Sequence, residues 1–289
     1  MSPTREQDLD GKTAIVTGAT SGLGRASAEL LAARGARLEL VARSASKAED
    51  TRAEIAKATG NDAIGIVIAD LASQAAVRSA AKQLLERCGP INLLLNNAGI
   101  TNLRRELTSD GIEATFAVNH LAYFLLTDLL LGRIFETEGA RIVSVSSDAH
   151  RFSGPLDLDD LESENRYAAM RVYGRSKGAN ILWTRELAKR IEGRGITANS
   201  LHPGFVRSSL GANNGAVGKI AIKIAGLFAM SAKKAAGYVV DVCTNPALAG
   251  TSGAYFYKAQ LHEPKAWATD EPTAQRLWEI SERMTGATQ

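Results

Sequence analysis

Thr13-Ala-Ile-Val-Thr17 is followed directly by Gly18-Ala-Thr-Ser-Gly-Leu-Gly24, and these twelve residues indicate the fold class. A run of strand length enters a turn with three glycines, and we expect a helix to begin at Arg25. In such a unit, backbone N–H groups and the helix dipole can hold a pyrophosphate, and glycine permits its close approach. A plain strand-to-helix turn is the alternative interpretation. The dinucleotide interpretation predicts cofactor contacts at Gly18, Thr20, Ser21, Gly22, Leu23 and Gly24.

The alternation of strand and helix continues along the chain. Further apolar runs of strand length occur at 37–41, 63–68, 93–95, 141–145 and 196–201, with helix-like segments between them. Parallel strands that are covered on both faces read as continuous apolar runs. The pattern therefore predicts an α/β fold with one doubly wound parallel sheet of the Rossmann type and helices on both faces. We find no linker that divides the chain, so residues 1–289 are predicted to form a single domain.

Composition narrows the class of protein. Of 289 residues 45% are hydrophobic, and the formal net charge is +3 with acidic and basic residues mixed along the chain. Without a basic block, nucleic acid is not an expected partner. Cys88 and Cys243 have no neighbouring Cys or His at ligand spacing, so we expect neither a disulfide framework nor a metal site. The two isolated cysteines fit a reducing setting, so we expect a cytoplasmic protein. The polar first residues predict a loose tail at 1–10 with no signal peptide or membrane span.

The second, third and fourth strands each end in residues that suit a dinucleotide. A fold that binds NAD would place a carboxylate after the second strand, but Ala42 and Arg43 stand there. Because Arg43 could pair with a 2′-phosphate, we expect NADP(H) to be preferred over NAD(H); a solvated loop cation is the alternative. Asp70 could contact the adenine, or Asp70 or Ser73 could cap the next helix. Further contacts are predicted at Leu71, Asn97, Ala98 and Gly99.

Tyr173 and Lys177 are four residues apart and share one face of a predicted helix. A phenol ordinarily titrates near pH ~10. A fixed ammonium beside it favours the ionised form, so we expect Lys177 to lower the pKa of Tyr173. A surface pair is the alternative for this motif taken by itself.

The chain resembles the short-chain dehydrogenase/reductase family over nearly its whole length. The motifs are Thr-Gly-x-x-x-Gly-x-Gly at 17–24, Asn-Asn-Ala-Gly at 96–99, Tyr-x-x-x-Lys at 173–177 and Pro-Gly at 203–204. Within the family it looks most like the retinol dehydrogenase group and its soluble bacterial relatives. That likeness is carried by Phe-Ala-Val-Asn-His-Leu at 116–121, Ser-Val-Ser-Ser-Asp-Ala-His at 144–150 and Arg-Leu-Trp-Glu-Ile-Ser-Glu at 276–282.

The resemblance implies a catalytic tetrad of Asn119, Ser147, Tyr173 and Lys177, with Ser146 the less favoured serine. Tyr173 would be the general acid/base and Ser147 would hold the substrate oxygen. Lys177 would also bind the nicotinamide ribose, and Asn119 would hold a water that links Lys177 to solvent. The resemblance further implies cofactor contacts at Tyr173, Lys177, Pro203, Gly204, Val206 and Ser208.

Two segments depart from the regular alternation. Ser147 and Tyr173 are 26 residues apart (173 − 147), about twice the spacing in most members of the family that the chain resembles. We therefore place an insertion near the active site at 151–172, and we expect its acidic side chains to be solvated. The apolar stripe within 211–230 predicts a substrate-binding lid at 208–232; a dimer face or ordinary core is equally compatible with it.

The sequence thus predicts an NADP-dependent ketoreductase that moves a hydride between nicotinamide and a carbonyl or alcohol of an apolar small molecule. Reduction of a C=C or C=N bond on the same site, or NADP(H) sensing without turnover, are the alternatives. A homodimer or homotetramer is typical of the family, and a monomer stays open.

Overall fold

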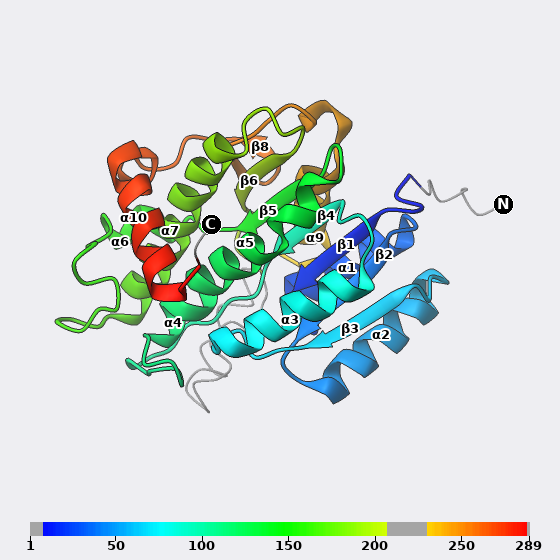
Figure 1. The fold of residues 1–289 in the computed structure, drawn as a ribbon, viewed down its shortest axis with the longest axis horizontal. Helices are drawn as coiled ribbons and strands as arrows, with labels where there is room; N and C mark the ends of the chain where they lie inside the picture. Colours follow the sequence, from blue (N-terminus) through cyan, green and yellow to red (C-terminus); the bar gives the residue numbers. More distant parts are fainter. Residues whose placement is uncertain (1–7, 207–229, 288–289) are drawn as a thin grey trace.

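The computed structural model describes residues 8–206 and 230–287. One eight-stranded sheet organises them in the order β3-β2-β1-β4-β5-β6-β7-β8 (Figure 1). All neighbouring strands are parallel except β7 and β8. The strands are β1 (Thr13–Thr17), β2 (Arg37–Ala42), β3 (Ile64–Ile68), β4 (Leu93–Asn96), β5 (Arg141–Val145), β6 (Thr197–His202), β7 (Tyr255–Tyr257) and β8 (Gln260–Leu261). The predicted doubly wound sheet in a single domain is confirmed.

Helices cover both faces of the sheet because its strand residues alternate between two cores. Ile15 packs into one core with α3 (Gln74–Arg87), α5 (Ala122–Phe135), α7 (Ala169–Arg190) and α10 (Glu271–Thr285). Its neighbours Ala14 and Val16 face a second core with α1 (Gly22–Ala33), α2 (Ala45–Thr59) and α9 (Ala232–Thr244). Figure 1 shows α3 and α5 crossing in front of the strands.

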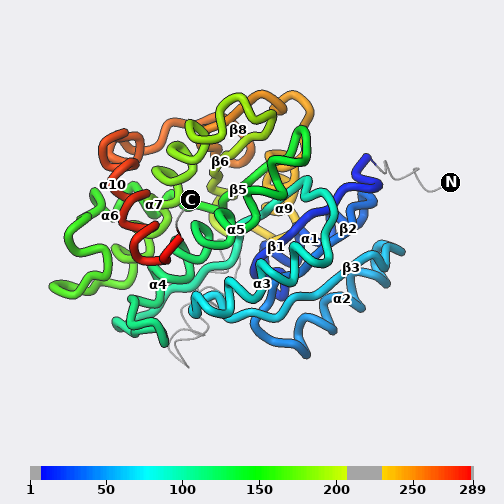
Figure 2. Tube along the Cα trace, in the orientation of Figure 1, coloured from blue at the N-terminus to red at the C-terminus, as the bar shows by residue number. Residues whose placement is uncertain are grey.

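Short helical segments complete the described chain. They are α4 (Ala114–Phe116), the π-helical turn η1 (Ala117–Leu121), α6 (His150–Ser153), and the 3-10 helices η2 (Pro246–Leu248) and η3 (Ala266–Thr269). The trace in Figure 2 shows α10 running beside α7. The helical stretch Ala114–Phe135 is the one described helix with the length and apolar composition of a membrane span, and 89% of its most apolar window is buried inside the protein.

Local boundaries differ from the expectations in three places. Helix α1 begins at Gly22 and not at Arg25, so Gly22 and Gly24 lie in its first turn. Residues of the predicted tail are held in place, because Leu9 N–H donates to the Arg34 carbonyl at 3.0 Å. The strands β7 and β8 were not predicted from the sequence, since runs of three and two residues are too short to show a period.

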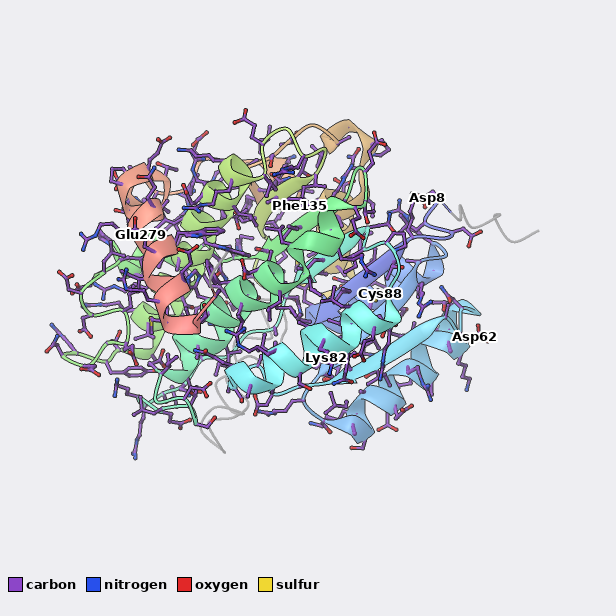
Figure 3. The ribbon with its side chains drawn as sticks, viewed as in Figure 1. Asp8, Asp62, Lys82, Cys88, Phe135 and Glu279 are labelled. Carbon is purple, nitrogen blue, oxygen red and sulfur yellow. The ribbon has the colours of Figure 1, made fainter. Side chains whose placement is uncertain are left out.

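The side-chain view shows where several charged residues lie. In Figure 3 the labelled side chains of Asp8, Asp62 and Glu279 lie at the periphery of the molecule. Cys88 and Cys243 are buried and free, one in each core. Among residues 8–206 and 230–287, no three His, Cys, Asp or Glu side chains gather in a way that could hold a metal ion.

Candidate active site

The parallel strands β1 to β6 end at one edge of the sheet, where ligands of open α/β folds bind. The strand order reverses direction between β1 and β4, and α1 begins just beyond β1. The predicted cofactor residues therefore converge on this edge, apart from Ser208, which lies outside the described residues together with most of the predicted lid.

The glycine turn after β1 is held against the end of β4. Thr17 Oγ1 accepts hydrogen bonds from the N–H groups of Asn97 and Ala98, at 2.9 and 3.1 Å. Asn97 Nδ2 in turn donates to the Thr17 carbonyl at 2.8 Å. A Cβ at Gly18, where φ is +67°, would lie 2.8 Å from Ala98 Cα. The Asn-Asn-Ala-Gly segment thus fixes the glycine turn, and Gly18 is required by both conformation and space.

The first turn of α1 fits a dinucleotide phosphate. It contains no acidic side chain, so its N–H groups and the positive end of its dipole face the sheet edge without a local counter-charge. Gly24 brings the helix close to Gly18 and Asn97, leaving no room there for a side chain.

Arg43 and Asp70 follow the next two strands. Arg43 is exposed after β2, with no ion pair to any residue in the described ranges. Asp70 is also exposed, and its carboxylate accepts from the Ala72 N–H at 3.0 Å. The cap of α3 is Ser73, whose hydroxyl accepts from the Ala76 N–H. Asp70 is therefore not the helix cap, and its side chain can meet a ligand at the edge.

Tyr173 and Lys177 lie on α7, which packs against β5 and β6. Lys177 is 2% exposed, and its Nζ donates to the Val145 carbonyl at 2.9 Å. The same Nζ lies 5.9 Å from the centre of the Tyr173 ring and 5.3 Å from that of Tyr123. The ammonium is thus beside the phenol but bonded to the sheet.

The two serines after β5 take different partners. Ser146 is buried and donates to the Lys177 carbonyl at 2.6 Å, so it fastens β5 to α7. The Ser147 hydroxyl accepts from the Ala149 N–H at 3.2 Å and lies close enough to the Tyr173 phenol to act on its pKa. The structure therefore brings Ser147 and Tyr173 together, and it keeps Ser146 away from the phenol.

Asn119 lies in the π-helical turn η1 and is fully buried. Its Nδ2 donates to the Ile100 carbonyl and to Ser176 Oγ, both at 3.0 Å, while its Oδ1 accepts from the Ile100 N–H at 2.8 Å. The wide turn accommodates this side chain, and such turns recur at functional sites. A Cβ at Gly99 would touch both Asn119 Oδ1 and Lys177 Nζ at 3.4 Å, so these groups face one another across Gly99.

Burial dominates the acid–base properties of the site. It raises the pKa of Tyr173 to about 12, although the Ser147 hydrogen bond acts in the opposite direction. It also lowers the pKa of Lys177 to about 7. The expectation that the pKa of Tyr173 is lowered is wrong, and Lys177 is not among the causes of its shift. Both groups lose hydration, and desolvation disfavours the charged form of each.

The segment after β6 completes the edge. Gly204 has φ +95°, and a Cβ there would lie 2.7 Å from the Met230 side chain. Val206 pairs with Met230 in an isolated parallel bridge, and Met230 N–H donates to the Phe205 carbonyl at 2.9 Å. Pro203, Gly204 and Val206 are therefore held beside the point where the described chain resumes.

The predicted insertion at 151–172 comprises the end of α6, a loop over 154–168 and the first residues of α7. Leu156, Leu158 and Leu161 pack against the core between α4, α7 and α10. The carboxylate of Asp160 accepts hydrogen bonds from the loop, including the Glu164 N–H at 2.7 Å. The loop is thus anchored to the helices through its leucines, and one of its acidic side chains stabilises its turn.

Sequence reasoning missed the glycines that let α7 approach this site. A Cβ at Gly174 would lie 2.5 Å from the Ala149 carbonyl oxygen and 2.6 Å from Ser153 Cβ. A Cβ at Gly178 would overlap the Trp267 ring. Glycines four residues apart occupy one helix face, so Gly174-x-x-x-Gly178 was a readable signal of a close contact. Ser176, which bridges Asn119 to the Tyr173 carbonyl, was also missed.

Comparison with known proteins agrees with this arrangement. The family model described as short chain dehydrogenase matches residues 12–217. Retinol dehydrogenase 14 of Homo sapiens is 40% identical over 294 residues, covering 96% of this chain and 87% of that protein. Retinol dehydrogenase 13 of Homo sapiens is 38% identical, covering 96% of this chain and 86% of that protein.

Solved structures give the same result. An uncharacterised protein from Mycobacterium paratuberculosis aligns with a TM-score of 0.79 at 29% identity, over 96% of this chain and 95% of that one. A short chain dehydrogenase from Burkholderia cenocepacia, solved in complex with NADP, aligns with a TM-score of 0.68 at 32% identity, over 86% of this chain and 96% of that one.

Proposed function

The chain belongs to the short-chain dehydrogenase family and is an NAD(P)-dependent oxidoreductase of alcohols and carbonyls; from this premise we propose that it prefers NADP(H) and acts on an apolar aldehyde, ketone or alcohol. The observation that carries the proposal is that the Ser147 hydroxyl lies beside the Tyr173 phenol, with the Nζ of buried Lys177 5.9 Å from the centre of the same ring. Location in the cytoplasm and assembly into a homo-oligomer stay predictions.

Several residues at the sheet edge fit the cofactor. Backbone N–H groups at the start of α1 would hold the pyrophosphate, and Arg43 would pair with the 2′-phosphate. Asp70 and Leu71 would flank the adenine, and Lys177 the nicotinamide ribose. NADP(H), when bound, supplies or accepts the hydride.

Side chains of the protein donate the proton that the substrate oxygen receives during reduction. With a pKa of about 12 Tyr173 keeps its proton at neutral pH, which suits donation to a carbonyl oxygen during reduction. Ser147 would hold the same oxygen, so the developing negative charge meets two hydroxyl donors. Lys177 would stabilise the phenolate that remains, and Asn119, bonded to Ser176, keeps η1 fixed against α7.

Support for an apolar substrate comes from side chains around this site. Phe152 on α6, Met170 on α7 and Phe205 after β6 are 89%, 66% and 57% exposed. Met170 shares α7 with Tyr173, Phe205 stands between Gly204 and Val206, and α6 follows the turn that carries Ser147. Relatives named retinol dehydrogenases act, by that name, on an apolar alcohol, and we propose the same chemical class for this chain.

The test is fluorescence titration with NADPH and NADH, followed by turnover on apolar aldehydes, ketones and enones, with retinal included. We expect tighter NADPH binding and carbonyl-dependent oxidation. Tyr173→Phe should abolish turnover and retain NADPH binding. Tyr238→Phe, on α9 at the opposite face of the sheet, should change neither.

The outcomes separate the alternatives. Turnover restricted to enones or imines would replace the carbonyl assignment with C=C or C=N reduction. NADPH binding without turnover on any substrate would favour sensing, and tighter NADH binding would refute the role of Arg43.

A further inference from the structure

His150 joins the backbone of Ser147 to the chain that follows β8. Its Nδ1 lies 2.7 Å from the Ser147 carbonyl oxygen. Its Nε2 lies 3.2 Å from the backbone nitrogen of Lys265. The side chain is completely buried. One ring therefore bridges the serine and a segment 115 residues away in the sequence.

These two partners fix the tautomer of the ring. The Lys265 N–H can only donate, so Nε2 of His150 must accept. A neutral imidazole has one donor and one acceptor, so Nδ1 carries the hydrogen and donates it to the Ser147 carbonyl. Both bonds are satisfied only by the neutral Nδ1–H form.

The surroundings hold the ring in that form. It packs edge-on against Tyr255 at 5.5 Å and against Trp267 at 6.2 Å between ring centres. Burial lowers its pKa, and the neighbouring Arg151 and His262 act in the same direction, against Asp148 and the Ser147 carbonyl. The imidazole therefore stays neutral at physiological pH.

We propose that His150 is a positioning residue for Ser147: its Nδ1–H fixes the Ser147 carbonyl, and thereby holds the Ser147 hydroxyl against Tyr173. The proposal rests on the function proposed above. Without this bond the Ser147 carbonyl retains the longer contact from the His150 backbone N–H, at 3.2 Å. The turn would then be free to rotate the hydroxyl away from the phenol.

Two variants of His150 each keep one of its two hydrogen bonds and remove the other. In His150→Asn the amide nitrogen can occupy the place of Nδ1 and donate to Ser147, while the contact with Lys265 is lost. In His150→Gln the longer amide can reach the place of Nε2 and accept from Lys265, while the bond to Ser147 is lost.

The kinetic readout is kcat for carbonyl reduction with NADPH. Misplacement of a reacting group by ~1 Å costs about 10²-fold. We expect His150→Gln to lower kcat by about 10- to 100-fold with the KM for NADPH unchanged, and His150→Asn to retain most of the activity. Equal losses in both variants would overturn the proposal, because a merely structural ring would be damaged by either change.

A second experiment tests whether the effect of His150 on kcat depends on Ser147. In a Ser147→Ala background the hydroxyl that His150 positions is absent, so His150→Gln should lower kcat no further. A full additional loss in the double variant would show that His150 does not act through Ser147.

A third arm does not depend on turnover, so it distinguishes failure of this proposal from failure of the proposed function. Protein labelled with ¹³Cζ-tyrosine reports the Ser147 hydrogen bond in the Tyr173 signal, assigned with Tyr173→Phe. His150→Gln should move that signal to its position in Ser147→Ala, while His150→Asn leaves it at the wild-type position. An unmoved signal in a folded His150→Gln protein would refute the positioning role even in an inactive enzyme.

Discussion

Gly174→Ala should damage the site although it adds only a methyl group. The new Cβ would lie 2.5 Å from the Ala149 carbonyl oxygen and 2.6 Å from Ser153 Cβ. Ordinary van der Waals contact begins near 3.4 Å, so α6 must move by about 0.9 Å. The contact involves backbone, which cannot turn aside as the end of a side chain can.

Two opposing terms set the effect on stability. Alanine in a helix interior is favoured over glycine by about 1 kcal/mol. Overpacking of a fitted contact costs about 1–3 kcal/mol. Gly174→Ala should therefore lower the free energy of unfolding by about 0–2 kcal/mol. Gly237→Ala in α9 is the matched control, because nothing lies within 4 Å of its Cβ. It should raise that free energy by about 0.5–1 kcal/mol.

The effect on activity should be larger than the effect on stability. Ala149 accompanies Ser147 in one turn, so a shift of nearly 1 Å reaches the hydroxyl that contacts Tyr173. At that displacement we expect kcat to fall by about 10²-fold. Urea denaturation and NADPH-dependent carbonyl reduction, measured on both variants, provide the test. If Gly174→Ala is stabilised as much as Gly237→Ala and keeps wild-type kcat, the close approach of α6 and α7 is not required.

Three further changes test other parts of the molecule. Burial lowers the pKa of Lys177 from 10.5 to about 7 in the folded protein. Between pH 7 and pH 10.5 the unfolded chain therefore binds more protons than the folded protein, so the free energy of unfolding rises with pH. Urea denaturation from about pH 7 to about pH 8.5 should show a gain of about 1–2 kcal/mol for wild type relative to Lys177→Met, and parallel profiles would contradict the burial argument. Arg43→Ala should weaken NADPH binding and leave NADH binding unchanged in a fluorescence titration, whereas loss of both would mean that the cation serves the fold. Gly65→Ala should lower the free energy of unfolding by about 1–3 kcal/mol, because its Cβ would overlap the buried Glu39 carboxylate; Glu39→Ala should relieve that cost, and an undiminished cost in the double variant would exclude the overlap.

Local chemistry made much of the architecture predictable. Strand and helix periods are properties of neighbouring residues, so the alternation that starts at Thr13 was sufficient to predict the doubly wound sheet and its cofactor edge. The four-residue spacing of Tyr173 and Lys177 likewise required only helix geometry. The predictions that failed also have local causes. Strands β7 and β8 were not predicted because they are too short to show an alternating pattern of apolar residues. The start of α1 was predicted three residues late because its first turn is rich in glycine.

Chain order and the spacing of motifs are enough to predict which residues reach the carboxyl edge of the sheet. What those residues face depends on packing between segments that are distant in the sequence. Ser146 and Ser147 are adjacent in sequence, yet Ser146 bonds the Lys177 carbonyl and Ser147 lies beside Tyr173, because α7 packs against β5 and, at Gly174, against α6. The pKa values of Tyr173 and Lys177 depend on burial by distant segments. The role of His150 likewise depends on Lys265, which no local pattern connects to it.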